Sequence, residues 1–141
     1  MLVELALSSV MVTLTAMAHG LGLLALARLL QLELLEEKAE HIRPLSMRGL
    51  LATLVVVLGL FGLHGAEIWG YAFLYDAIGA VHGFRESLYF SIITYAAIGY
   101  DDRSMAESWR LVSAIEGING IILIGWSTAF FTTRISRFRR I

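Results

Sequence analysis

The chain has 141 residues, of which 57% are hydrophobic and 16% charged, and its formal net charge is −1. A soluble domain usually carries about 25% charged residues, and a single core of this size cannot hide so much apolar surface. The composition therefore excludes soluble globular, disordered and collagen-like proteins and indicates a bilayer as the solvent. The absence of cysteine excludes disulfides and thiolate sites, and the near-neutral charge offers no basic surface for nucleic acid.

The first apolar segment covers residues 2–32 and is charged only at Glu4 and Arg28. Because about 20 residues cross a bilayer as a helix, residues 1–32 are predicted to form an N-terminal transmembrane helix. A cleaved signal peptide ending near Ala18 is the alternative. It lacks a basic leading region, since no Lys or Arg precedes Arg28, and the apolar sequence continues beyond Ala18.

A charged linker and a second span follow. Residues 33–49 hold most of the charges of this half of the chain, and Pro44 within them is expected to stop the preceding helix. An outer helix is predicted over residues 50–76, where Glu67 is the only charge before Asp76. Aromatic residues gather at the far end of this span, as they do at membrane interfaces.

The next apolar segment, residues 84–96, is too short to cross a bilayer as a helix. Such a segment, followed by an acidic turn with glycine, is typical of a re-entrant structure, which is tolerated at depth only where protein or water covers it. Ser104 and Glu107 then have the spacing of a capping box. They predict the start of an inner helix over residues 105–138, in which Glu116 is the only charge between Leu111 and Thr133.

The distribution of basic residues predicts the orientation of the chain. Loops on the cytoplasmic side carry an excess of Lys and Arg, so the linker and the C-terminus are expected inside and the N-terminus outside. The C-terminal arginines are expected to anchor this orientation and are candidates for binding anionic lipid. The basic residues concerned are Arg28, Lys38, Arg43 and Arg48 around the linker and Arg134, Arg137, Arg139 and Arg140 at the C-terminus.

Residues 87–102, which read SLYFSIITYAAIGYDD, resemble the pore helix and filter of the tetrameric potassium-channel family. The family pattern ends Thr-x-Thr-Thr-Val/Ile-Gly-Tyr-Gly-Asp. The family's paired bracing aromatics match Tyr89 and Phe90, and its hinge glycine lies near Gly120. Matches within the filter pattern are Thr94, Ile98, Gly99, Tyr100 and Asp102.

The resemblance covers about two thirds of the chain and implies an all-α integral membrane homotetramer. Each subunit would supply three transmembrane helices, a re-entrant pore helix over residues 84–96 and a filter loop over residues 97–102. The arrangement is also similar to small bacterial ion-channel family proteins, which implies a bacterial inner or plasma membrane. The implied function is passive cation permeation; a non-conducting structural or regulatory subunit derived from a channel is the alternative.

In the family, backbone carbonyls of the filter replace the hydration shell of the ion. The corresponding residues here are Ala97, Ile98, Gly99, Tyr100 and Asp101. The sequence departs from the family where Ala96 and Ala97 replace threonines and Asp101 replaces the second glycine. Asp101 and Asp102 then bring carboxylates to the outer mouth, and hard cations prefer carboxylate oxygen. The pattern therefore favours a general cation pathway, with K⁺, Na⁺ or Ca²⁺ in the filter, over strict K⁺ selectivity.

Several residues of the inner helix are candidates for the pore. If i is the residue that follows Gly120, positions i, i+3 and i+7 form a stripe on one face of the helix, and this stripe is expected to line the pore cavity. Asn119 is expected at the border of this stripe. Glu116 either supports the filter from behind, together with Tyr89, Phe90 and Thr94, or forms a hydrogen bond between helices in a protonated state. The cavity-lining residues are Ile121, Ile124 and Thr128.

His64 and Glu67 stand three residues apart on one helix face. With Glu116 they resemble the ligands of a membrane metalloenzyme, but the di-iron motif has the reverse order, Glu-x-x-His. A hydrogen-bonded packing pair is the preferred interpretation, and His19 is interpreted as a packing residue as well. We therefore expect no catalytic residue, no cofactor and no metal other than permeant cations.

Overall fold

The computed structural model describes residues 1–40, 47–99 and 104–138, with side chains described for residues 1–30, 47, 50–99 and 104–133. Every regular element in these ranges is helical. They are α1 (Leu2–Glu40), α2 (Met47–Ala77), α3 (Phe84–Tyr95), a single 3₁₀ turn (Glu107–Trp109) and α4 (Arg110–Phe138).

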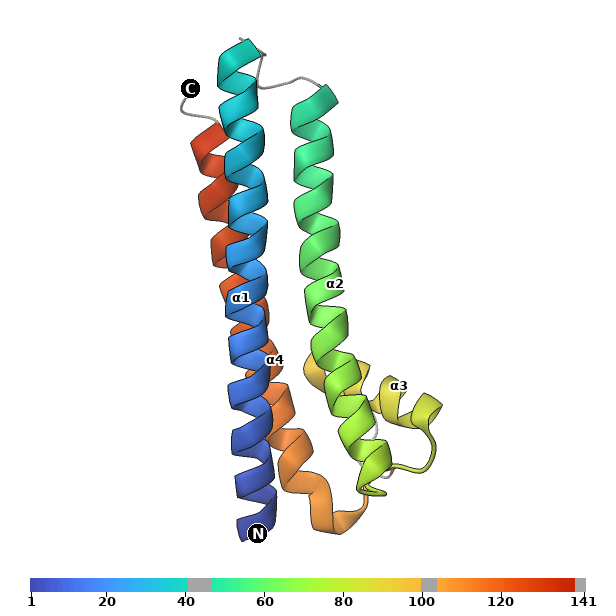
Figure 1. The fold of residues 1–141 in the computed structure, drawn as a ribbon. Helices are drawn as coiled ribbons and strands as arrows, with labels where there is room; N and C mark the ends of the chain where they lie inside the picture. The colour runs from blue at the N-terminus through green and yellow to red at the C-terminus, as the bar shows by residue number, and fades with distance from the viewer. Residues whose placement is uncertain (41–46, 100–103, 139–141) are drawn as a thin grey trace.

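Three of the helices are long and apolar enough to cross a membrane, over Leu2–Leu30, Leu50–Ala77 and Glu107–Thr133. They run side by side, and α3 lies at the end where α2 finishes and α4 begins (Figure 1). The prediction of an all-helical protein with three membrane-length spans is therefore confirmed.

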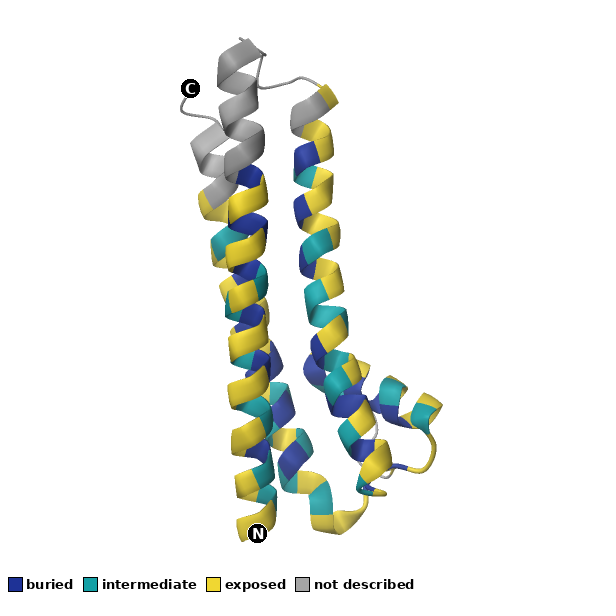
Figure 2. Cartoon of the chain, viewed as in Figure 1, coloured by how far each residue is buried: buried dark blue, intermediate teal, exposed yellow. Residues whose placement is uncertain are grey.

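Exposed residues run along the described parts of the long helices (Figure 2), and many of them are large and apolar. On α2, for example, Leu54, Val55 and Leu58 are all exposed. Exposing such a surface to water is unfavourable, whereas lipid tails are as apolar as the side chains themselves. Only a narrow stripe of each helix is buried, as expected for a bundle solvated by lipid.

Two apolar clusters hold the helices together. The first joins α1 to α2, and the second packs the end of α2, the loop after it, α3 and the start of α4 into one unit. The second cluster is what fixes α3 against both of its neighbours. The first cluster consists of Leu23, Leu26, Leu30, Ala52, Val56 and Leu60, and the second of Tyr71, Tyr75, Ala80, Val81, Phe90, Met105 and Val112.

The start of the last helix differs from the sequence prediction. The residue that caps the 3₁₀ turn is Ala106, not Ser104, and no side chain caps it, so the predicted capping box is wrong. Packing explains the difference, because Met105 is buried in the second cluster and the Ala106 N–H donates to the Ala80 carbonyl at 2.9 Å. These contacts hold residues 105 and 106 outside the helix. Pro44, predicted to end α1, lies outside the described residues.

Candidate functional site

The C-terminal end of α3 lies beside the middle of two membrane-length helices. The Tyr95 hydroxyl oxygen is 2.9 Å from Nδ1 of His64, which is near the centre of the Leu50–Ala77 span. The backbone of Tyr95 packs against Gly120, near the centre of the Glu107–Thr133 span. α3 begins beside α2, where the Phe84 ring lies 4.7 Å from the Phe73 ring and 5.6 Å from the Trp69 ring, and it runs obliquely across the bundle (Figure 1) to finish at this level.

Glycine on α4 permits this close approach. A Cβ built on Gly120 would lie 2.2 Å from the Tyr95 carbonyl oxygen, and one on Gly117 would lie 3.4 Å from the Thr94 carbonyl oxygen. No side chain fits at the first position without moving the backbone of α3. Gly120 therefore has a packing role here, and its role as a hinge stays a prediction.

The backbone turns sharply after α3. The Ile98 N–H donates to the Ile93 carbonyl at 2.8 Å and the Ala97 N–H to the Thr94 carbonyl at 2.9 Å, which is the Schellman pattern. Ala97 occupies the left-handed position of this motif with φ 57°, and Gly99 follows with φ 62°. Glycine is the usual residue at such positions because a Cβ raises their energy.

The predicted filter is described only in part. Ala97, Ile98 and Gly99 are exposed in the single subunit. A cavity of about 470 Å³ between α3 and α4 is lined in part by Ala97 and Gly99, and also by Thr94 and Ile121. Tyr100, Asp101 and Asp102 lie outside the described residues, as do Arg139 and Arg140 and the side chains of Arg134 and Arg137.

Glu116 joins three helices. It is fully buried on α4, and its carboxylate accepts hydrogen bonds from the hydroxyls of Tyr75 on α2 and Ser91 on α3, both at 2.5 Å. The Ser91 hydroxyl also lies 3.0 Å from the Ile68 carbonyl oxygen. Glu116 is thus a hydrogen-bonding centre between helices, and its role in supporting a filter stays a prediction.

The other predicted site residues divide into buried and exposed sets. Phe90 is buried and meets the Tyr75 ring edge-on at 5.7 Å, and Thr94 is partly buried near Gly117. Tyr89 is 51% exposed and Ile121, Ile124 and Thr128 are all exposed, so these four are free to meet other copies of the chain or water.

Asn119 does not border the predicted pore stripe. It is buried, and its Nδ2 donates to Oγ1 of Thr15 at 2.8 Å and to the Tyr71 hydroxyl at 3.2 Å. The expectation for this residue is therefore wrong. The amide faces α1 and α2, where buried hydroxyls satisfy it, because an unpaired amide in an apolar interior is costly.

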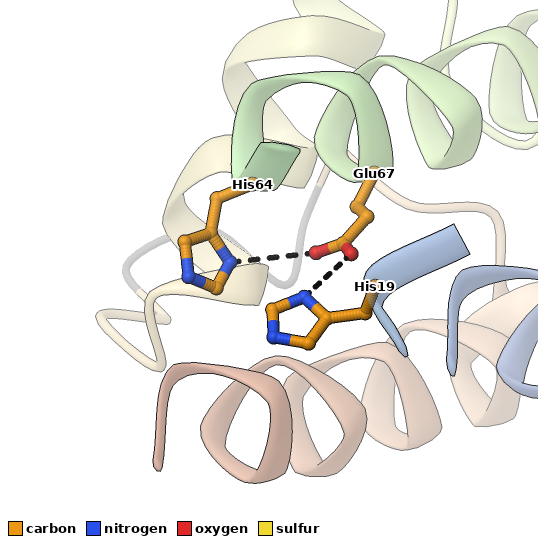
Figure 3. A group of neighbouring side chains, drawn as sticks. All are labelled: His19, His64 and Glu67. Atoms are coloured by element: carbon orange, nitrogen blue, oxygen red, sulfur yellow. Dashed lines mark hydrogen bonds and ion pairs between the residues drawn. The ribbon is translucent and has the colours of Figure 1, made fainter. Parts of the chain in front are cut away.

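Sequence reasoning missed a ring of polar side chains around the end of α3. His19 Nδ1 lies 2.8 Å from Glu67 Oε1, and the Tyr95 hydroxyl donates to Glu67 Oε2 (Figure 3 shows the histidines and the glutamate). Ser127 Oγ closes the ring, 3.0 Å from His64 Nε2 and 3.2 Å from His19 Nε2. In the sequence, the one sign of these residues is that they are polar within otherwise apolar spans.

Comparison with known proteins places this geometry in a family. A family model described as an ion channel matches residues 54–137, which is more than half of the chain. The protein therefore belongs to this ion-channel family. The match runs from within α2 to the last turn of α4 and leaves α1 outside. No curated protein and no solved structure matches the chain.

Proposed function

We propose that the protein is a cation channel in which four copies surround one pore. In this arrangement α3 is the re-entrant pore helix, and residues 97–102 form the filter. Ions cross passively, down their gradient. The proposal goes beyond the family assignment in naming the assembly, the filter and the ions.

One observation carries the proposal: residues 96–99 are non-helical and exposed, and they directly follow the end of α3 at the level of the span centres. Lipid tails cannot hydrogen-bond to peptide groups, so irregular backbone at this depth is tolerated only where protein or water covers it. Assembly of several copies around a water-filled axis meets this requirement. The exposed faces that carry Tyr89 on α3 and Ile121, Ile124 and Thr128 on α4 are available for such an assembly.

The chemistry of the filter follows from its residues. Rings of backbone carbonyls from four copies replace the water that a cation loses. Ala97 contributes a carbonyl but no hydroxyl, so the innermost ion site has fewer oxygens than one built on threonine. Asp101 and Asp102 add two carboxylates from each subunit at the outer mouth, which attract cations of several kinds. We therefore propose permeation by K⁺ together with Na⁺ and Ca²⁺, without a cofactor.

The proposed orientation follows the basic residues of the sequence. With the linker and the C-terminal arginines in the cytoplasm of a bacterial cell, the filter faces the outside, because α3 lies at the opposite end of the bundle from the start of α2 (Figure 1). The C-terminal arginines then lie beside the anionic inner leaflet.

The test is ion flux into liposomes that contain the purified protein, with K⁺, Na⁺ and Ca²⁺ compared. We expect the wild type to pass all three ions. Gly99→Ala should lower the flux at least tenfold, because a Cβ disfavours the left-handed φ of 62° within the filter.

Gly79→Ala is the matched control. Gly79 has a similar φ of 66°, and a Cβ at either glycine meets no atom within 4 Å, but Gly79 lies in the loop after α2. The control should lose similar stability and keep its flux. Tetramers that pass none of the three ions would instead show a non-conducting subunit, and equal flux in both variants would show that Gly99 is not part of the conduction path.

A further inference from the structure

Two histidines and a carboxylate converge inside the bundle, next to the end of α3. His19 comes from α1, and His64 and Glu67 come from α2 (Figure 3). Each offers one ligand atom, and these atoms all lie within 4.8 Å of one another. His19 and Glu67 are buried, while the side chain of His64 retains 18% of its exposure.

The two imidazole rings direct the same atoms toward the same partners, although their planes are tilted by 44°. The Nδ1 atoms of His19 and His64 both face the Glu67 carboxylate, at 2.8 Å from Oε1 and 3.4 Å from Oε2. Their Nε2 atoms both face the Ser127 hydroxyl oxygen. In metal sites, the distant ring nitrogen of a histidine ligand usually donates to an oxygen, which leaves the near nitrogen unprotonated toward the ion. Ser127 Oγ has two lone pairs and can serve both rings in this way.

A count of hydrogens shows that a carboxylate and two neutral histidines supply one hydrogen fewer than the contacts of the cluster require. The ring of five side chains makes five hydrogen-bonding contacts, and each contact requires one hydrogen. The Tyr95 and Ser127 hydroxyls and two neutral imidazoles supply one hydrogen each, so a carboxylate and two neutral histidines leave one contact without a hydrogen. An additional proton completes the ring, and a metal ion between the Nδ1 atoms and the carboxylate can take its place.

In place of the packing role expected from the sequence, we propose that His19, His64 and Glu67 bind a divalent transition-metal ion, with Zn²⁺ as the reference case. The Tyr95 hydroxyl oxygen is the fourth ligand. Ligand atoms about 2.0–2.1 Å from a tetrahedral zinc ion lie about 3.3 Å from one another. Three of the separations are 2.8 Å (His19–Glu67), 3.4 Å (His64–Glu67) and 2.9 Å (His64–Tyr95). The contact between Tyr95 and Glu67 is shorter, so a bound ion would move these two oxygens apart.

Charge balance fits this ligand set. The ion displaces the additional proton of the ring and the Tyr95 hydroxyl proton, so two protons leave as one divalent ion enters. The bound site then holds the metal, one carboxylate, one phenolate and two neutral imidazoles, and its net charge is zero. Neutrality matters because an unbalanced charge in an apolar interior is costly.

The cluster is open to a mostly apolar hollow on the side of His64. A cavity of about 300 Å³ between α2 and α4 is lined by His64 and Ser127 and also by Ile124 and Thr128. The last two are proposed to line the pore, so a cation would reach His64 from the conduction path. Only this route rests on the proposed function; the ligand set does not.

The test is zinc binding by the full chain in detergent, after removal of metals with a chelator and dialysis. Isothermal titration with ZnCl₂ should give one Zn²⁺ per chain. Glu67→Gln and His19→Gln should each weaken binding at least 100-fold, because an amide keeps a hydrogen bond within the ring but is a poor zinc ligand. Ser127→Ala should keep the stoichiometry and weaken binding about 10–100-fold, as loss of an orienting partner does.

Two controls separate this site from others. His82→Gln changes an exposed loop histidine, and the double variant Asp101→Asn, Asp102→Asn removes the carboxylates of the outer mouth. Both should bind Zn²⁺ as the wild type does. Loss of stoichiometric binding in either control would overturn the proposal, and so would unchanged binding by Glu67→Gln or a wild type that binds no zinc.

Cobalt provides a readout that needs no variant. Wild-type protein loaded with Co²⁺ should show the strong visible absorption of a four-coordinate ion, and the weak absorption of six-coordinate Co²⁺ would contradict the ligand set even if the variants fail to fold. Because these measurements need no transport, they are independent of the flux assay. A protein that binds zinc but passes no ions would contradict the proposed function alone.

Discussion

Ala97 and Gly120 show how single positions control the approach of α3 to α4. Ala97 takes the left-handed position of the Schellman turn with φ 57°. The potassium-channel pattern has threonine here, but a branched side chain is costly at positive φ. In this structure, restoring the threonine at position 97 would therefore strain the turn. Alanine fits better because it is the smallest residue that still carries a Cβ.

Overpacking usually costs about 1–3 kcal/mol, and we expect Gly120→Ala near the upper end of that range, with a net destabilisation of about 1–2 kcal/mol. The reason is that the new Cβ would lie 2.2 Å from the Tyr95 carbonyl oxygen, and backbone must move to admit it. This cost exceeds the gain of about 1 kcal/mol that alanine has over glycine within a helix. Denaturant unfolding in detergent, followed by helical circular dichroism, measures the difference.

Gly125→Ala is the matched control for this change. Gly125 is also in α4, but a Cβ there meets no atom within 4 Å, so only the gain in helix propensity of up to about 1 kcal/mol should remain. If both substitutions stabilised the protein equally, the close contact between α3 and α4 would be contradicted.

Among the elements, α1 is the helix outside the matched family region, and buried polar contacts attach it to the rest of the bundle. Asn119 on α4 donates to Thr15 on α1, and Glu67 on α2 bonds to His19 on α1. Interhelical hydrogen bonds are important between membrane helices because apolar side chains gain little by leaving lipid. They therefore select the rotation and depth at which α1 packs.

Thr15→Val should destabilise the protein by about 1 kcal/mol. Valine has nearly the same shape but no acceptor, so one amide hydrogen of Asn119 loses its partner inside the bundle. Thr13→Val is the control, because Thr13 is exposed and its hydroxyl bonds only to the Ser9 carbonyl of its own helix. Thermal unfolding of the two variants in the same detergent separates them, and equal midpoints would show that the Thr15 contact contributes nothing.

Hydropathy predicted the elements well, but it could not predict how they face one another. Three long apolar segments are visible in the sequence because the bilayer demands about 20 apolar residues for each span. The burial of Asn119 toward α1, the meeting of His19 with Glu67 and the late start of α4 all depend on contacts between distant segments. Local periodicity carries no information on the rotation of one helix relative to another, so these features were missed or mistaken.

At the scale of the whole molecule, the described subunit leaves many apolar side chains and the turn after α3 uncovered (Figure 2). Lipid covers the apolar part, and the proposed assembly covers the turn. The sequence supplied the potassium-channel resemblance in residues 87–102, and the family match supports an ion channel. The number of copies and the ions remain predictions, because they depend on contacts between chains.

Replacing Asp101 and Asp102 together by asparagine should reduce Ca²⁺ flux more than K⁺ flux. A ring of carboxylates concentrates cations at the mouth of a pore, and it does so more strongly for divalent ions. The reduction should be several-fold at low ionic strength and should fade near 1 M salt, where the Debye length is about 3 Å. Asp76→Asn, at an exposed position in the last turn of α2, is the control and should have no effect. A reduction that is independent of salt would place the two aspartates elsewhere.

Glu67 bonds to Tyr95, the last residue of α3, and also to His19 on α1. These two bonds connect α1 to the residue immediately before the turn. A shift of α1 along the bundle axis would therefore have to break the bond to Glu67 or move Glu67 relative to the end of α3. In the proposed channel, these contacts would connect the depth of α1 in the bilayer to the residue that precedes the filter.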